Sequence, residues 1–287
     1  MVQYGSACCE RCRYGAGDAT TAALHGEIIL MAAGSRFLSN ISRRVWGRAR
    51  QTALNALGRT SFGTVTSVRT AKPVVAITFD GGPDERWTPQ VLDVLDAHKA
   101  KATFFVIGKY IDAHPEIAER QYASGHVLGN HTYEHPSFPL VSSVERLKEL
   151  RRCADTLTQY PQKQRLFRAP YLDQGLRSRF DTWRRGYTDI ACSLHANDWE
   201  DIGAEEIAAK LIDKAQPGDI IMLHDAVCDQ RYRSRAAMIE ALDRFLGARR
   251  DLGFVTVPDL MQMGRPVRGI WLKRPNLARF ATYERDI

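Results

Sequence analysis

The stretch VVAITFDGGP, residues 74–83, is a short apolar run that ends abruptly in an aspartate, two glycines and a proline. Six further apolar runs follow along the chain, separated by longer segments with apolar residues at helical spacing. The seven runs cover residues 74–79, 102–107, 126–129, 165–169, 188–194, 219–223 and 254–257. Strand–helix alternation predicts a parallel sheet covered by helices, and seven strands in succession favour an α/β fold, a distorted (β/α)7-type barrel of parallel strands with outer helices.

Helical spacing predicts the segments between the strands. Residues 88–98 begin with Thr88-Pro89, a favourable start because proline fits the first turn of a helix. The other predicted helices cover residues 110–123, 142–159, 205–215 and 235–249. These helices would form the outer layer of the barrel.

Charge divides the 287-residue chain unevenly. Residues 1–72 hold ten basic and three acidic residues, which is the whole net charge of +7, and residues 73–287 are balanced. A balanced body lacks the basic face typical of nucleic-acid binding, so we expect no nucleic-acid partner. We divide the chain into a basic N-terminal extension (1–72), a main domain (73–265) and a C-terminal tail (266–287).

The N-terminal extension itself has two parts. Residues 1–35 show no clear periodicity and are interpreted as partly disordered or as lying upstream of a true start at Met31. Residues 36–58 place apolar residues at helical spacing among five arginines. Such an amphipathic helix either packs on the body or lies on an anionic membrane surface, so peripheral membrane contact through residues 36–58 stays open.

The sequence gives little sign of export. The apolar stretch at residues 28–34 is far shorter than the ~20 residues that cross a bilayer, and acidic residues interrupt the region where a signal peptide would lie. The six cysteines show neither a zinc-binding spacing nor a disulfide framework. We therefore expect a cytoplasmic protein.

Five of the predicted strands are followed by polar residues that can take part in catalysis or metal binding. These endings are Thr78–Pro83, Asn130–His135, Arg168–Tyr171, His195–Trp199 and Leu223–Asp225. In a barrel of parallel strands, the carboxyl ends meet at one mouth, so we expect the five endings to converge there. His131 and His135 have the i,i+4 spacing that places two imidazoles on one face, which suits a zinc-like divalent metal; two unrelated surface histidines are the alternative.

The same five endings resemble the motifs of the polysaccharide deacetylase family, which is carbohydrate esterase family 4 with its chitooligosaccharide deacetylase homology domain. TFDGGP (78–83) is similar to TFDDGP, HTYEH (131–135) to HTxxH, and RAPY (168–171) to RxPY. NDW (197–199) is similar to the end of DxxDW, and LHD (223–225) to LxH. The order of the motifs is kept over residues 73–260.

The resemblance implies a hydrolase that removes N-acetyl groups from an amino-sugar polysaccharide, oligosaccharide or lipid-linked sugar, so the expected partner is an N-acetylated glycan. By position, Asp80 matches the base that takes a proton from the attacking water, and Arg168 matches the residue that tethers this base. His224 matches the acid that protonates the leaving amine, and Asp198 matches its orienting partner. An acid, a base and a polarising group are what amide hydrolysis requires.

The resemblance also implies positions for substrate and metal. The backbone N–H of Tyr171 matches a donor to the oxyanion. Pro170, in the same motif, is also assigned to the substrate-binding site. Trp199 and Leu223 match apolar walls around the acetyl methyl group. His131 and His135 match two ligands of a divalent metal, with zinc expected and cobalt or nickel as alternatives.

One position departs from the family pattern. The second aspartate of TFDDGP is the third metal ligand in the family, and this chain has Gly81 there. Metal binding is therefore expected to be weakened or absent, unless Asp84, Glu85, His195 or a water replaces the carboxylate. The alternatives to a metal-assisted deacetylase are a metal-independent amidohydrolase and a glycan-binding relative without catalysis.

Overall fold

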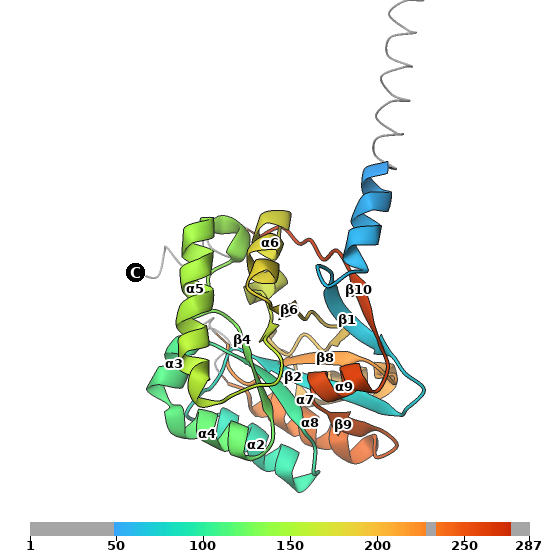
Figure 1. Cartoon of the computed structure of the whole chain (residues 1–287). Helices are drawn as coiled ribbons and strands as arrows, with labels where there is room; N and C mark the ends of the chain where they lie inside the picture. The colour runs from blue at the N-terminus through green and yellow to red at the C-terminus, as the bar shows by residue number, and fades with distance from the viewer. Residues whose placement is uncertain (1–48, 228–233, 277–287) are drawn as a thin grey trace, which may run out of the picture. The chain divides into compact units, whose positions relative to one another are not determined.

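The computed structural model describes residues 49–227 and 234–276, and its centre is a parallel sheet (Figure 1). The strands are β2 (Val74–Asp80), β3 (Ala102–Val106), β4 (Val127–Asn130), β5 (Leu166–Phe167), β6 (Thr188–Asp189), β7 (Leu194–His195), β8 (Ile220–His224) and β9 (Gly253–Val255). They follow the order β6-β5-β4-β3-β2-β8-β7, with β9 also paired to β2, and the registered pairs within this sheet are parallel. The sheet curls into a half-barrel, which confirms the predicted parallel α/β architecture.

Helices pack around this sheet. They are α2 (Thr88–Ala97), α3 (Gly108–Ala113), α4 (Pro115–Ala123), α5 (Ser143–Thr156), α6 (Leu176–Arg184), α7 (Ala204–Lys214), α8 (Ala236–Ala248) and α9 (Val257–Gln262), with short 3-10 turns η1 (Phe138–Leu140), η2 (Leu157–Gln159) and η3 (Pro170–Leu172). The single helix predicted over residues 110–123 is wrong, because Pro115 forces His114 out of helical geometry and separates α3 from α4.

Alternation along the strands separates an outer core from the barrel interior. In β2, Ile77 and Phe79 join the main apolar core with residues of α2, α7 and α8. Thr78 and Asp80 point to the opposite face, because successive side chains in a strand alternate. The same rule holds in β8, where Leu223 belongs to the outer core. The chemistry of the site is therefore carried by every second residue.

The strand predicted over residues 188–194 is two strands at opposite ends of the sheet. β6 pairs with β5, whereas β7 pairs with β8. The intervening backbone turns away from regular pairing, and the carbonyl oxygens of Ile190 and Ala191 accept hydrogen bonds from Arg168 instead. An apolar run alone could not reveal this division, since Ile190, Ala191 and Cys192 continue the run between the two strands without a turn residue.

The compact body reaches beyond the predicted limits of 73 and 265. Strand β1 (Thr64–Arg69) pairs antiparallel with β10 (Arg265–Gly269), and Val65 and Val68 of β1 are buried. This pairing brings residues assigned to the N-terminal extension and to the C-terminal tail into one two-stranded sheet. Antiparallel strands far apart in sequence leave no local signal, because the partner is not a neighbour in the chain.

Residues 49–58 are helical, and they are the end of the amphipathic helix predicted over 36–58. The rest of that prediction lies outside the described residues, as do residues 1–35 and half of the predicted C-terminal tail. Within the described ranges, no helix is long and apolar enough to cross a bilayer.

Candidate active site

Asp80 and Arg168 form a buried ion pair at the centre of the barrel mouth. Asp80 ends β2, and its Oδ1 accepts a hydrogen bond of 2.6 Å from Nη1 of Arg168, which follows β5. Both side chains are almost fully removed from solvent. A buried charge of this kind is stable only when it is paired and hydrogen-bonded. The structure therefore brings together the predicted base and its predicted tether.

The guanidinium of Arg168 has further partners that fix its position. Its Nη1 also donates to Oγ1 of Thr78 at 2.7 Å, Nη2 donates to the carbonyl of Ala191 at 2.8 Å, and Nε donates to the carbonyl of Ile190 at 3.2 Å. The ring of Phe105 lies beneath it, with 4.2 Å from the guanidinium carbon to the ring centre. Planar, multiply bonded arginine is well suited to this task, and lysine could not make these contacts together.

His131 and His135 converge as the i,i+4 spacing predicted. Their Nε2 atoms are 3.2 Å apart, and Nε2 of His131 is 4.0 Å from Oδ2 of Asp80. Nδ1 of His131 lies 2.9 Å from the carbonyl oxygen of Arg168 and must donate to it, since a carbonyl only accepts. Burial lowers the pKa of His131, so this ring is neutral with a lone pair on Nε2. That is the state in which histidine binds a metal.

His224 and Asp198 form the second pair at the mouth. Oδ1 of Asp198 lies 3.1 Å from Nδ1 of His224, and Oδ2 accepts from the backbone N–H of His224 at 2.8 Å. Burial alone would lower the pKa of His224, but the charge and hydrogen bond of Asp198, with Asp80 further off, outweigh it and raise this pKa above its ordinary value. His224 is thus held toward its protonated form, with Nε2 carrying the second proton.

Arg235 supports this pair and was missed in the sequence. Its Nη1 donates to the backbone carbonyl of Asp198 at 2.6 Å and lies 3.4 Å from Oδ2 of the same residue. Arg235 is buried at the start of α8, 37 residues beyond Asp198. No local spacing links the two, so only the fold reveals the contact.

Asp225 is a further buried carboxyl group that the sequence did not single out as functional. It accepts hydrogen bonds from Oγ1 of Thr88 at 2.7 Å and from the backbone N–H of Gly82 at 3.2 Å. Burial raises the pKa of Asp225 to about 7. These contacts tie the end of β8 to the loop after β2, which holds Asp80 in place.

Two motif loops pass through left-handed backbone conformations without glycine. Tyr171 has φ 58°, Thr132 has φ 72° and His135 has φ 68°. Such values are uncommon for residues with a side chain and gather at functional sites. The rings of His135 and Tyr171 lie 4.6 Å apart, centre to centre, which joins the RAPY loop, including Pro170, to the histidine pair.

The two predicted apolar walls lie in different surroundings. Trp199 is partly exposed, and its ring lies 5.3 Å from that of His224, edge to face. Leu223 is wrong as a wall, because it is fully buried in the outer core. Met222 shares the inward face with His224, since alternate residues of a strand point the same way. The structure therefore replaces Leu223 with Met222 on the inward face of β8.

The described residues do not supply the three-ligand set that the family pattern requires. Gly81 offers no side chain, and within the ranges that the structure describes no three His, Cys, Asp or Glu side chains gather as a metal-binding group. Asp84 instead accepts from the backbone N–H groups of Arg86 and Trp87, and His195 lies against Trp199. Of the predicted ligands in these ranges, the two histidines alone fit a metal ion.

The backbone conformation at Gly81 is one that residues with a side chain rarely adopt. Gly81 has φ 98°, and a Cβ built on it would lie 2.4 Å from the carbonyl oxygen of Ala226. Both facts exclude an ordinary L-residue without movement of the loop after β8. The missing carboxylate therefore coincides with a backbone position that disfavours a side chain.

Comparisons with known proteins identify the family of this chain. Residues 67–189 match the family model for polysaccharide deacetylase. A peptidoglycan-N-acetylglucosamine deacetylase of Bacillus cereus is 35% identical over 197 residues, which cover 66% of this chain and 88% of that protein. A chitooligosaccharide deacetylase of Sinorhizobium fredii is 34% identical over 204 residues, covering 67% of this chain and 93% of that protein.

A solved structure shares the fold closely. The crystal structure of a peptidoglycan N-acetylglucosamine deacetylase in complex with a benzamide compound superposes with a TM-score of 0.63 at 28% identity, covering 70% of this chain and 94% of that one. The chain therefore belongs to the polysaccharide deacetylase family, carbohydrate esterase family 4. Members of this family generally depend on a divalent metal.

Restoring the family aspartate by Gly81→Asp should destabilise the fold. The positive φ costs about 1–3 kcal/mol, and the contact with Ala226 adds to it. Gly186→Ala is the matched control, because Gly186 has φ 75° but nothing within 4 Å of its built Cβ. Thermal unfolding should show a larger loss for Gly81→Asp than for Gly186→Ala. Equal losses would mean that the Ala226 loop moves aside freely.

Proposed function

We propose that this protein hydrolyses the N-acetyl group of amino-sugar polymers by acid/base attack of water. One observation carries the proposal: Asp80 and His224 are direct partners in the register of β2 and β8. Neighbouring strands lie about 4.8 Å apart, so the carboxylate and the imidazole end up side by side at the barrel mouth. An amide held between them would meet a proton acceptor on one side and a donor on the other.

The surroundings give the two groups opposite tasks. Asp80 is ion-paired with Arg168 and can take the proton of the attacking water. His224 is held toward its cationic form by Asp198 and can protonate the leaving nitrogen. Two titratable groups with opposed environments are the usual basis for assigning base and acid. The backbone N–H of Tyr171 is proposed as a donor to the oxyanion, and Trp199 as a wall for the acetyl methyl group.

Substrate class follows from the relatives. The Bacillus cereus protein is named for peptidoglycan N-acetylglucosamine, and the Sinorhizobium fredii protein for chitooligosaccharides. We infer that this chain acts on a glycan containing N-acetylglucosamine, with a lipid-linked sugar as the alternative substrate of the same chemistry. Glycan binding without hydrolysis is the second candidate, and Gly81 is the observation that favours it.

A divalent metal, with zinc first among zinc, cobalt and nickel, is proposed to bind His131 and His135 only weakly. A bound ion would polarise the acetyl carbonyl and acidify the attacking water. Structural zinc sites have four protein ligands and catalytic sites usually three. Two imidazoles without a carboxylate fall short of both.

Acetate release from N-acetylglucosamine oligomers tests the proposed reaction. Asp80→Asn should lower the rate about 10²–10⁴-fold, the usual contribution of a positioned base. Asp213→Asn changes an exposed aspartate in the same way and should leave the rate unchanged. Unfolding curves for both variants show whether the protein is still folded. Wild-type protein that binds the oligomers but releases no acetate would establish the glycan-binding role instead.

The pH dependence of the rate should depend on His224. Its acid form is present below its raised pKa, so activity should fall as the pH rises through that value. Asp198→Asn removes the charge that raises the pKa, and the alkaline fall should move to lower pH. An NMR titration of the His224 ring should show the same shift without substrate. An unchanged ring pKa in Asp198→Asn would exclude Asp198 as the orienting partner.

Zinc affinity tests the two-histidine site separately from catalysis. Calorimetric titration of metal-free protein should give weak binding, and His135→Gln should abolish it because one imidazole remains. His98→Gln is the control, since His98 pairs with Asp243 away from the site. Binding that survives His135→Gln would show that another group completes the site.

A further inference from the structure

Helix α6 has its polarity reversed. Its buried side chains are polar, namely Ser178, Arg179, Asp181 and Thr182. Arg179 donates to the backbone carbonyls of Phe62 at 2.6 Å and Ser61 at 3.2 Å, and Asp181 accepts from Nε of Arg146 at 2.8 Å. These bonds fix the polar face inward. The apolar face of the helix is consequently held toward solvent.

That outward face is a continuous apolar stripe. Leu176, Phe180 and Trp183 are 38%, 46% and 40% exposed, and their i, i+4, i+7 spacing places them on one side of the helix. The rings of Phe180 and Trp183 lie 5.9 Å apart, centre to centre. On an ordinary surface helix such a stripe would face the core.

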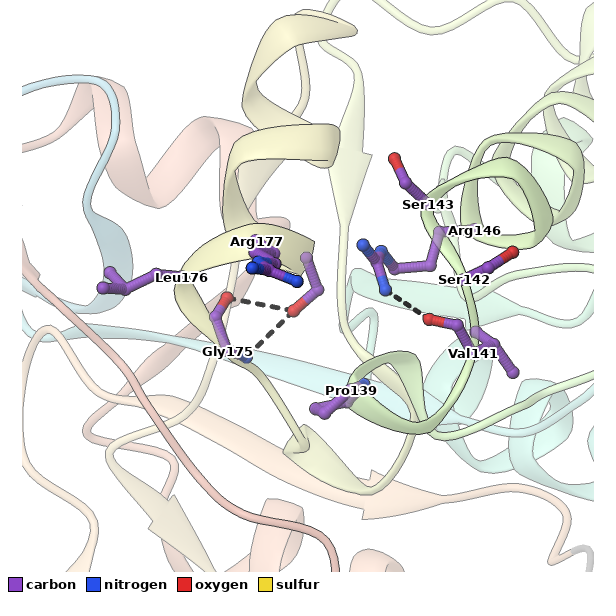
Figure 2. Close-up of a pocket in the computed structure, with 9 residues that line it drawn as sticks. Pro139, Val141, Ser142, Ser143, Arg146, Gly175, Leu176 and Arg177 are labelled. Atoms are coloured by element: carbon purple, nitrogen blue, oxygen red, sulfur yellow. Dashed lines mark hydrogen bonds between the residues drawn. The ribbon is translucent and has the colours of Figure 1, made fainter.

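The other large exposed apolar side chains of the described residues gather around the same helix. They are Leu57, Leu140, Val144 and Leu272, and with the stripe they are here termed the α6 patch. Leu140 and Val144 lie in the chain segments whose neighbouring residues line a groove of about 590 Å³ (Figure 2). The lining residues are Pro139, Val141, Ser142, Ser143 and Arg146, together with Gly175, Leu176, Arg177 and Ser178 at the start of α6.

The chain segments beside α6 connect the remaining two residues to it. Leu57 precedes Ser61 and Phe62, and both of these contact Trp183. Leu272 precedes Lys273, which pairs with Gln174 two residues before α6 begins. Exposed apolar side chains that cluster in this way are typical of an interaction surface.

The charge of the α6 patch selects the partner. The exposed charged residues on α6 and its C-cap are Arg177, Arg184 and Arg185, and the one acidic residue of the helix, Asp181, is buried. The guanidinium of Arg184 lies 5.5 Å from the ring centre of Phe180. Arginines beside an apolar stripe, with no exposed carboxylate on the same helix, favour an anionic partner.

We propose that the α6 patch docks this enzyme on an anionic lipid bilayer surface. Phe180 and Trp183 would enter the headgroup region, where aromatic rings are favoured, and the three arginines would contact lipid phosphates. A second copy of the chain packed symmetrically on the same patch would oppose these arginines to themselves. A membrane surface offers an apolar layer to the stripe and anionic phosphates to the arginines.

Vesicle co-sedimentation of the full chain tests this docking. Wild-type protein should bind vesicles of phosphatidylcholine mixed with phosphatidylglycerol more tightly than vesicles of phosphatidylcholine alone. Phe180→Ser should weaken binding about tenfold, as expected for one buried aromatic side chain. Arg184→Gln should weaken it about fivefold, and Arg250→Gln, an equal change at an exposed arginine just beyond the C-terminal end of α8, should have no effect.

Control measurements distinguish membrane docking from misfolding and from self-association. Unfolding curves and acetate release on a soluble oligomer should be the same for wild type and the α6 variants, so that lost binding cannot be attributed to misfolding. Binding that is equal in wild type, Phe180→Ser and Arg184→Gln would overturn the proposal and leave residues 36–58 as the candidate for membrane contact. An oligomer seen by light scattering that Phe180→Ser dissolves, without vesicle binding, would identify a subunit interface and also overturn it.

Discussion

The ion pair between Arg168 and Asp80 is the constraint on which the rest of the site depends. Removing two charges from water costs several kcal/mol per ion, and the cost is recovered only when the remaining donors are also bonded. Here Thr78, Ile190 and Ala191 take the other hydrogens of the guanidinium. The carbonyl of Arg168 also fixes the tautomer of His131. One residue thereby positions both the proton acceptor and the first histidine.

Much of this could be predicted from the sequence, because the signals are local. Buried parallel strands such as β2 and β8 appear as apolar runs, and each motif directly follows a strand end. The pairs Asp80–Arg168 and Asp198–His224 were expected from the family motifs and are found in contact. Two features could not be predicted from local patterns. Strands β1 and β10 pair although they lie about 200 residues apart in the chain. Helix α6, which was not predicted, buries polar residues in place of apolar ones.

The direction of individual side chains and the backbone angles of the loops could not be predicted from the sequence. Leu223 lies next to His224 in the chain, but neighbours in a strand point to opposite faces, so Met222 is the one directed inward. Thr132, His135 and Tyr171 have positive φ angles, and their residue types give no indication of this. Gly81 was visible as a missing ligand, whereas its clash with the Ala226 carbonyl depends on a loop from another strand. A side chain at position 81 would therefore depend on two loops, the one after β2 and the one after β8.

The seam between β6 and β7 has a consequence for how this barrel can change. A closed barrel would place a neighbouring strand against the carbonyl groups of Ile190 and Ala191, and here the guanidinium of Arg168 occupies that role. The backbone of Val65 also pairs with Ile190 and accepts from Ala191, so Arg168 contributes to closing the scaffold while it aligns Asp80. A change at Arg168 that loosened the seam would also release Asp80, so this is an energetically costly place to widen the barrel for longer glycans.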